Sequence, residues 1–148
     1  MHIRPVRRIL RRLSPSRRMN VAMSLRPSTF ELPADSSAPG LARACLDVAA
    51  RPDPEVAADV ALVTSEVVAN AVKHAGMRPT DDILLRVDPG DRIHVEVLHT
   101  GPGFDPGPPR PGSGWGLRFL AQLAQNWGVE REANRTKVWF EVQRSGVR

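Results

Sequence analysis

Apolar and polar residues alternate in four segments of the chain, which is the pattern of strands with one buried face. These segments are 28–35, 83–87, 93–97 and 137–142. The first, STFELPAD, stops at Pro33, as expected of a short edge strand. The second and third flank the turn sequence DPGD and predict a β-hairpin. The fourth follows GVERE and a turn at 133–135, so it predicts a closing hairpin.

Apolar residues recur with helical spacing in three other segments. These are 37–50, 54–75 and the stretch GSGWGLRFLAQLAQNW at 112–127. Asp53 is a suitable N-cap for the second helix and Gly76 a suitable C-cap, while Trp127 is placed on the apolar side of the third helix. Strands and helices in this order predict an α/β (α+β) two-layer sandwich. Its sheet is mixed, mainly antiparallel, and covered on one face by about three helices.

The second helix combines a buried stripe with an unusual polar row. The stripe is predicted from valines at 4-3-4 spacing, Val56, Val60, Val63 and Val67. Glu66, Asn70 and His74 lie four residues apart on another face, with neighbours about 6 Å from each other. Because few residues are polar in this half of the helix, an acid and an amide in register indicate a chemical role.

Two glycine clusters frame a proline-rich segment. Gly101 and Gly103 follow the strand that ends in His99, and three more glycines, at 112, 114 and 116, precede the third helix. Glycine allows close approach of the backbone to a ligand, and a helix N-terminus favours anions. The clusters therefore predict a phosphate-binding site, with FDPGPPRP (104–111) as a short lid. Neither a P-loop motif nor a dinucleotide-binding βαβ unit is found.

The positive charge is concentrated at the start of the chain. The formal net charge is +5, but residues 1–18 contain seven arginines and no acid, so the remainder carries a net charge of −2. We expect a basic, disordered tail at 1–27, one domain at 28–143 and a short C-terminal tail at 144–148. Three alternatives are open for the start: an amphipathic helix that binds anionic lipid or nucleic acid, a disordered leader, or translation from Met19 or Met23.

No segment has the length and apolar character of a secretory signal or a membrane span. We therefore expect a cytoplasmic protein without a membrane span. Cys45 is the only cysteine, which excludes an intramolecular disulfide and a cysteine metal cluster.

Three motifs in order resemble those of a known ATP-binding fold. SEVVANAVKHAG resembles the N box, HTGPGF the first glycine box and GSGWGL the second glycine box of the Bergerat-type fold. Sensor histidine kinases, the gyrase and heat-shock-90 ATPases and MutL share that fold. The small size, the opening FELPAD, the short lid and the ending KVWFEV are similar to bacterial anti-sigma-factor serine kinases. The resemblance covers roughly residues 28–143.

The resemblance implies a role for each matching residue. Glu66 is implied as the general base and Asn70 as the residue that holds Mg²⁺ on ATP. Lys73 and His74 either lie near the nucleotide or only complement the helix C-terminus. The remaining implied nucleotide-binding residues are Gly101 and Gly103 beneath adenine and ribose, Gly112, Gly114, Gly116 and Leu117 around the phosphates, and Thr136 at the floor of the adenine pocket.

His99 departs from the family pattern. The first glycine box of the family begins with an aspartate that accepts a hydrogen bond from the adenine amino group. A neutral imidazole can accept through one nitrogen, whereas a protonated one only donates. Loss of a charged buried acceptor costs about 1.5–3 kcal/mol. Either His99 alters the adenine reader, or it ends the strand half-exposed while Thr100 or a water makes the contact.

The resemblance implies an ATP-binding regulator of transcription. It would act as a serine/threonine protein kinase, a transferase, on a small anti-sigma-factor antagonist, and exchange between that antagonist and a sigma factor. The alternative is a non-catalytic interaction module, nucleotide-binding or nucleotide-free, with a degenerate adenine site. Pairing of two copies is left open by the sequence.

Overall fold

The computed structural model describes residues 26–74, 81–100, 115–132 and 135–144. These residues form five strands and three helices. The strands are β1 (Ser28–Pro33), β2 (Asp82–Asp88), β3 (Arg92–Thr100), β4 (Asn126–Glu132) and β5 (Arg135–Gln143). The helices are α3 (Ala38–Ala49), α4 (Pro54–His74) and α5 (Trp115–Leu123).

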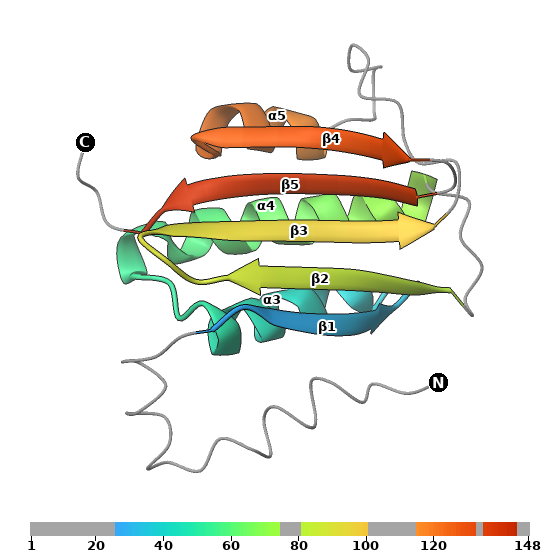
Figure 1. Cartoon of the computed structure of the whole chain (residues 1–148), viewed down its shortest axis with the longest axis horizontal. Helices are drawn as coiled ribbons and strands as arrows, with labels where there is room; N and C mark the ends of the chain where they lie inside the picture. Colours follow the sequence, from blue (N-terminus) through green and yellow to red (C-terminus); the bar gives the residue numbers. More distant parts are fainter. Residues whose placement is uncertain (1–25, 75–80, 101–114, 133–134, 145–148) are drawn as a thin grey trace.

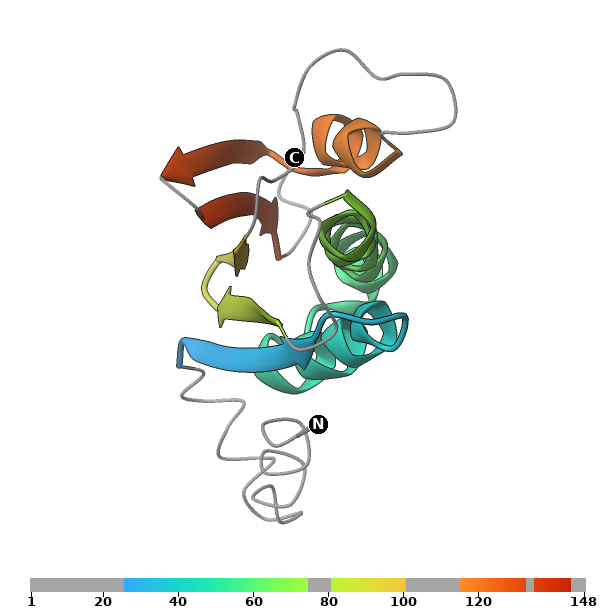
Figure 2. The same cartoon turned by 90° about the vertical axis from the view of Figure 1, so that its right-hand side faces the viewer.

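The strands form one open sheet in the order β1-β2-β3-β5-β4, and each neighbouring pair is antiparallel. Figure 1 views the sheet from its uncovered face, and Figure 2 shows α3, α4 and α5 together on the other side. The predicted two-layer fold is therefore confirmed, although the described strands include no parallel pair. β1 lies at one edge, where Pro33 can lack an N–H group at little cost.

The hydrophobic core lies between the sheet and the helices. Alternate residues of every central strand are buried on that side, because side chains of a strand point to opposite faces in turn. From α4, Val60, Val63 and Val67 are buried as predicted, and Val56 is partly buried against the core. Burial of each such side chain contributes about 1.5–3 kcal/mol, so the core fixes α4 firmly across the sheet.

Helix α4 begins where the sequence predicts. The carbonyl of Asp53 accepts hydrogen bonds from the N–H groups of Val56 (3.0 Å) and Ala57 (2.9 Å). Pro54 occupies the first helical position, where a missing N–H group leaves no bond unmade. The predicted C-cap, Gly76, lies outside the described residues.

The prediction that the third helix continues to Trp127 was wrong. Helix α5 ends at Leu123, and Trp127 lies in β4 opposite Phe140. The N–H group of Gln125 already donates to the carbonyl of Glu141 (2.9 Å), while its side-chain oxygen accepts from the N–H group of Gln143 (2.6 Å). Pairing with β5 thus ends a helical pattern that the local sequence would have continued.

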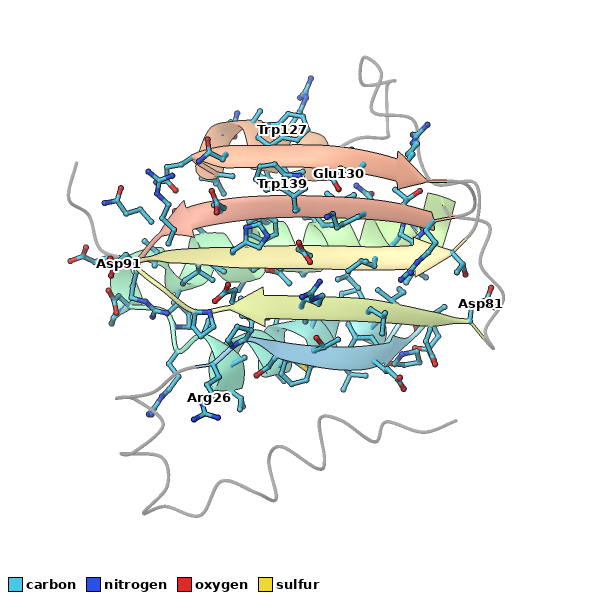
Figure 3. All side chains as sticks on the ribbon, in the orientation of Figure 1. Arg26, Asp81, Asp91, Trp127, Glu130 and Trp139 are labelled. Carbon is cyan, nitrogen blue, oxygen red and sulfur yellow. The ribbon has the colours of Figure 1, made fainter. Side chains whose placement is uncertain are left out.

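The uncovered face of the sheet carries a polar network. His94 lies between Glu141 (Nδ1–Oε2 3.1 Å) and Glu96 (Nε2–Oε1 3.3 Å), and Lys137 Nζ is 3.7 Å from Glu96. Trp139, labelled on β5 in Figure 3, stacks on His94 with ring centroids 5.6 Å apart. Partly exposed ion pairs of this kind contribute at most about 1 kcal/mol each. The predicted nucleotide-binding residues that the structure describes do not belong to this network.

Candidate functional site

Three element ends meet at one end of the sandwich. The C-terminal end of α4, the C-terminal end of β3 and the N-terminal end of β5 all lie at the right-hand side of Figure 1, which faces the viewer in Figure 2. α4 also packs against both strands. Predicted site residues from three distant parts of the sequence, Asn70, His99 and Thr136, stand at these ends.

The polar row of α4 is held in place by its buried neighbours. Glu66 and Asn70 are half-buried, whereas Val67 and Ala71 beside them are fully buried against the sheet. One helical turn separates the carboxylate from the amide, which gives a spacing of about 6 Å between their β-carbons. An acid and an amide are thus presented side by side on a helix that cannot rotate without exposing its apolar stripe.

The two remaining predicted residues at this end of α4 are Lys73 and His74. Lys73 is exposed at the end of α4, so its placement fits a general preference of cations for helix C-termini as well as a ligand contact. The backbone of His74 ends the helix, and its side chain lies outside what the structure describes.

His99 is buried on the helix-facing side of the sheet. Only 3% of its surface is exposed, and it pairs directly with Thr136 of β5, which is 2% exposed. The alternative in which His99 ends its strand half-exposed is therefore wrong. β3 and β5 together bring an imidazole and a hydroxyl next to each other inside the molecule.

The hydrogen bonds of His99 assign its tautomer. Nδ1 lies 3.3 Å from the carbonyl oxygen of Thr100. A carbonyl only accepts, so Nδ1 carries the proton and Nε2 carries a lone pair. Burial lowers the pKa of His99 below its ordinary value of 6.5, and the bond to Thr100 opposes this only in part. The ring is accordingly neutral at pH 7.

The second nitrogen of His99 has no partner among the residues that the structure describes. Nε2 is fully buried there without a hydrogen bond. A buried acceptor left unpaired costs about 1–3 kcal/mol, so native proteins nearly always satisfy such atoms. An amino group of a ligand would satisfy this nitrogen.

The donor set also fits Mg²⁺ that arrives with a nucleotide. Mg²⁺ prefers oxygen ligands and commonly takes one or two from protein and the rest from phosphate and water. The side-chain oxygen of Asn70 suits such a site, and the half-buried carboxylate of Glu66 stands one turn away. Within the described ranges, no group of three or more His, Cys, Asp or Glu side chains could hold a metal ion.

The glycine clusters are described only in part. Gly101, Gly103, Gly112 and Gly114 lie outside the described residues. Gly116 and Leu117 belong to the first turn of α5, so a helix does begin directly after the second glycine cluster.

Sequence reasoning missed two polar features of this region. Thr64, two residues before Glu66, is fully buried, and its hydroxyl has no hydrogen bond within the described part of the chain. The backbone carbonyl of Thr100 assigns the His99 tautomer. Burial of Thr64 follows from its position between the predicted valines, but a backbone contact such as that of Thr100 leaves no signal in residue types.

The fold and this arrangement place the chain in a family. Residues 32–142 match the histidine kinase-like ATPase domain, so the chain belongs to that family. Family members bind ATP, as the three sequence motifs imply. The expected membership of the broad ATP-binding family that includes the histidine kinases is thereby confirmed. No curated protein matches the chain in sequence.

Two solved structures are similar to the chain. One contains the RsbU and RsbW domains of Rv1364c from Mycobacterium tuberculosis, with a TM-score of 0.61 and 21% identity. The match covers 79% of this chain and 31% of that one. The other is the histidine kinase domain of a blue-light activated histidine kinase from Erythrobacter litoralis EL346, with a TM-score of 0.50 and 30% identity. It covers 61% of this chain and 45% of that one.

The chain thus spans less than half of either structure, and the first likeness concerns the fold alone. Among the helices that the structure describes, none is long and apolar enough to cross a membrane.

Proposed function

We propose that the protein is an ATP-dependent protein kinase that phosphorylates a serine or threonine of a small regulatory protein. The observation that carries the proposal is the pair of Glu66 and Asn70, half-buried one turn apart at the end of α4 in a member of an ATPase family. A carboxylate beside a metal-holding amide is placed to act as the general base for attack on the terminal phosphate.

The chemistry requires few groups from the protein. The hydroxyl oxygen of the substrate forms a bond to the γ-phosphorus, the bond from that phosphorus to the bridging oxygen breaks, and ADP leaves with the bond electrons. The hydroxyl proton passes to the carboxylate of Glu66. Asn70 would hold Mg²⁺, which neutralises phosphate charge when bound. Glycines 101, 103, 112, 114 and 116 would give the nucleotide close contact with backbone.

The sequence supports a partner of a particular kind. The opening FELPAD, the short lid and the ending KVWFEV resemble anti-sigma-factor serine kinases. We infer that the phosphorylated protein is an antagonist, that a sigma factor is the alternative partner, and that transcription is controlled by exchange between them. Residues 28–143 would form the domain that carries out both tasks.

A second candidate is a non-catalytic interaction module with the same partners. It is favoured by one observation, the histidine at position 99 where the family has an aspartate. In that case the protein would hold its partner without transferring phosphate.

Phosphate transfer distinguishes the two candidates. Purified protein is incubated with γ-labelled ATP, Mg²⁺ and a panel of small antagonist proteins, and label on the antagonist is measured. We expect Glu66→Gln to slow transfer by about 10²-fold or more, because a general base contributes that much. ATP affinity should change less than threefold. Glu55→Gln, an exposed acid in the first turn of the same helix, is the matched control and should transfer normally.

Two results would contradict the proposal. Transfer by Glu66→Gln at the wild-type rate would remove Glu66 as the base. Partner binding by the wild-type protein without transfer to any antagonist would support the non-catalytic module instead.

A further inference from the structure

The uncovered face of the sheet carries more acids than bases. Its side chains come from alternate strand residues, those that do not point toward the helices. Within the five strands, seven acidic and four basic side chains belong to this face, which gives it a formal net charge of −3. The described helices all lie on the other side of the sheet (Figure 2), so none of them covers this charge.

Three of the seven acids have no ion pair with any residue that the structure describes. Three of the four bases form ion pairs on this face, at distances of 2.8–3.9 Å: Arg86, Arg92 and Lys137. The fourth base, Arg135, lies opposite Glu132 in the hairpin. The acids without such a neighbour are exposed and lie on β1 and β2, at one edge of the sheet: Glu31, Asp82 and Asp88. The unpaired negative charge is therefore concentrated at that edge.

Apolar side chains lie beside these acids. Leu84 of β2 and Leu98 of β3 are directly opposite each other and only partly buried. Trp139 of β5, labelled in Figure 3, is also partly buried and lies diagonally across from Leu98. A segment that contacts both the acids and these apolar groups needs positive charge and apolar side chains together.

The first residues of the chain have this composition. Residues 1–18, called the basic segment below, contain seven arginines, no acid and five aliphatic side chains: Ile3, Val6, Ile9, Leu10 and Leu13. The segment precedes β1, and β2 is the neighbour of β1 in the sheet. The basic segment is thus joined to the edge of the sheet that carries the unpaired acids.

The length of the connection matches the size of the face. The arginines at positions 4–18 precede Ser28 by 10–24 residues. A flexible chain of that length spans about 17–28 Å, and five strands at a spacing of about 4.8 Å form a face about 19 Å across. A tether of this kind gives an effective concentration in the millimolar range, so even a weak contact is well populated.

We propose that the basic segment binds the uncovered face of its own sheet, with its arginines on the three unpaired acids and its aliphatic side chains on Leu84 and Leu98. The interaction is intramolecular and lies on the opposite side of the sheet from α4. It is independent of the proposed function, because no part of it requires ATP. Salt should release the segment, since the charges involved are exposed to solvent.

A spin label on the segment tests the proposal in the full chain. A nitroxide is attached to Ser14→Cys, and broadening of ¹³C-labelled leucine methyl signals is measured. Burial raises the pKa of the native Cys45 thiol to about 12, so the label reacts at position 14 alone.

Leu62 is the internal control for this measurement, because it is an exposed leucine on α4, on the helix side of the sheet. At about 0.1 M salt we expect the Leu84 and Leu98 signals to lose about threefold in intensity relative to the reduced label. The Leu62 signal should keep its intensity. The two lost signals should recover at about 1 M salt, where the Debye length is only about 3 Å.

Two triple variants of the labelled chain separate the face from the overall charge. The first neutralises the unpaired acids of the face: Glu31→Gln, Asp82→Asn and Asp88→Asn. The second removes the same charge from the helices: Asp47→Asn, Glu55→Gln and Asp59→Asn. We expect the first variant to lose the broadening of Leu84 and Leu98, and the second to keep it.

Several results would overturn the proposal. These are absence of broadening at the lower salt concentration, which would leave the segment for another partner such as duplex DNA, equal broadening of Leu62 and Leu84, persistence at high salt, and equal loss in both triple variants. A mixture of spin-labelled ¹²C chains with unlabelled ¹³C-leucine chains provides the last check. Broadening in the mixture as strong as within one chain would assign the contact to a second copy and contradict intramolecular binding.

Discussion

A buried histidine links the stability of the protein to pH. Because the folded protein lowers the pKa of His99, the unfolded chain binds a proton more readily below the ordinary value of 6.5. The contribution of His99 to the free energy of unfolding is thus fully present above about pH 6.5 and decreases as the pH falls from there toward the lowered pKa. A decrease of the free energy of unfolding with falling pH is expected for any buried base that is held neutral in the folded protein.

Urea unfolding at pH 7.5 and at pH 5.5 measures this effect. We expect the free energy of unfolding of the wild type to decrease between these pH values by more than that of His99→Gln, which has no titrating group at this position. Titration of carboxylates is common to both proteins and cancels in the difference. An equal decrease in both proteins would show that His99 titrates normally in the folded state.

The sequence predicted the position of His99 at the end of its strand but not its surroundings. The position of His99 follows from the strand pattern 93–97 and the glycines after it. Its burial depends on β5, which begins 36 residues later and places Thr136 beside it. The half-exposed alternative failed because a residue at a strand end is covered or uncovered by elements that the local sequence does not contain.

Glycine and tryptophan are matched across the β4–β5 hairpin. A β-carbon added at Gly128 would lie 2.6 Å from Nε1 of Trp139 and 2.8 Å from its Cε2. The indole is also stacked on His94, and that contact would be lost if the ring turned away from Gly128. A side chain at position 128 must therefore displace Trp139.

We expect Gly128→Ala to lower the free energy of unfolding by about 1–3 kcal/mol, the usual cost of overpacking. Gly40→Ala is the control, because its β-carbon would meet nothing closer than 3.5 Å and alanine favours a helix by about 1 kcal/mol. Thermal or urea unfolding measures both. Unchanged stability of Gly128→Ala would show that Trp139 is free to turn away.

Arg144, directly after β5, contacts both the β2–β3 turn and the loop before α4, at the end of the sandwich opposite the candidate site. Its N–H group donates to the carbonyl of Asp91 (2.9 Å), Nε to that of Gly90 (3.0 Å) and Nη1 to that of Arg51 (3.0 Å). Arg51 has a φ of 46°, a value that side-chain-bearing residues rarely adopt. The guanidinium thus ties the β2–β3 turn to the loop before α4.

Replacement of Arg144 by alanine should lower the free energy of unfolding by about 1–3 kcal/mol, since it removes two side-chain bonds to backbone carbonyls. Arg43→Ala, on the exposed side of α3, should change it by less than about 0.5 kcal/mol. Denaturant unfolding of the two variants provides the comparison. Equal effects would mean that the Arg144 contacts contribute nothing specific.

Helix α5 shows where local sequence fails. The periodicity of GLRFLAQLAQNW continues past Leu123, so sequence alone extends the helix to Trp127. The backbone groups of residues 125–132 instead pair with β5, whose own pattern was recognised correctly. The end of β1, the turn between β2 and β3 and the start of α4 were predictable because prolines or turn residues mark them, and no such residue separates α5 from β4.

The helices and strands that the structure describes do not include the basic residues at the start of the chain. A fragment of residues 26–144 removes eight arginines and no acid, and changes the formal net charge from +5 to −3. We expect it to fold and to bind ATP as the full chain does. Any binding of the full chain to duplex DNA should decrease with salt and be absent in the fragment, which a filter-binding assay measures. Loss of the fold in the fragment would contradict the proposed domain boundaries.

The sheet and helix α4 together hold the candidate site residues at one end of the molecule. Helix α4 is fixed by buried valines, and β3 and β5 bring His99 and Thr136 to the same end from separate parts of the sequence. The sequence motifs predicted these participants, and the sheet order explains why they meet. The central claim is that this end binds ATP with Mg²⁺.

Calorimetric titration of the purified chain with ATP at pH 8.0, with and without Mg²⁺, tests that claim most directly. We predict saturable binding that requires Mg²⁺ and is weakened by about tenfold or more in Asn70→Ala. Asn126→Ala is the control and should bind ATP normally, because the amide of Asn126 donates a hydrogen bond to Glu141 (3.1 Å) on the uncovered face of the sheet. Absence of ATP binding by the folded wild-type protein, or equal affinity of wild type and Asn70→Ala, would contradict the account.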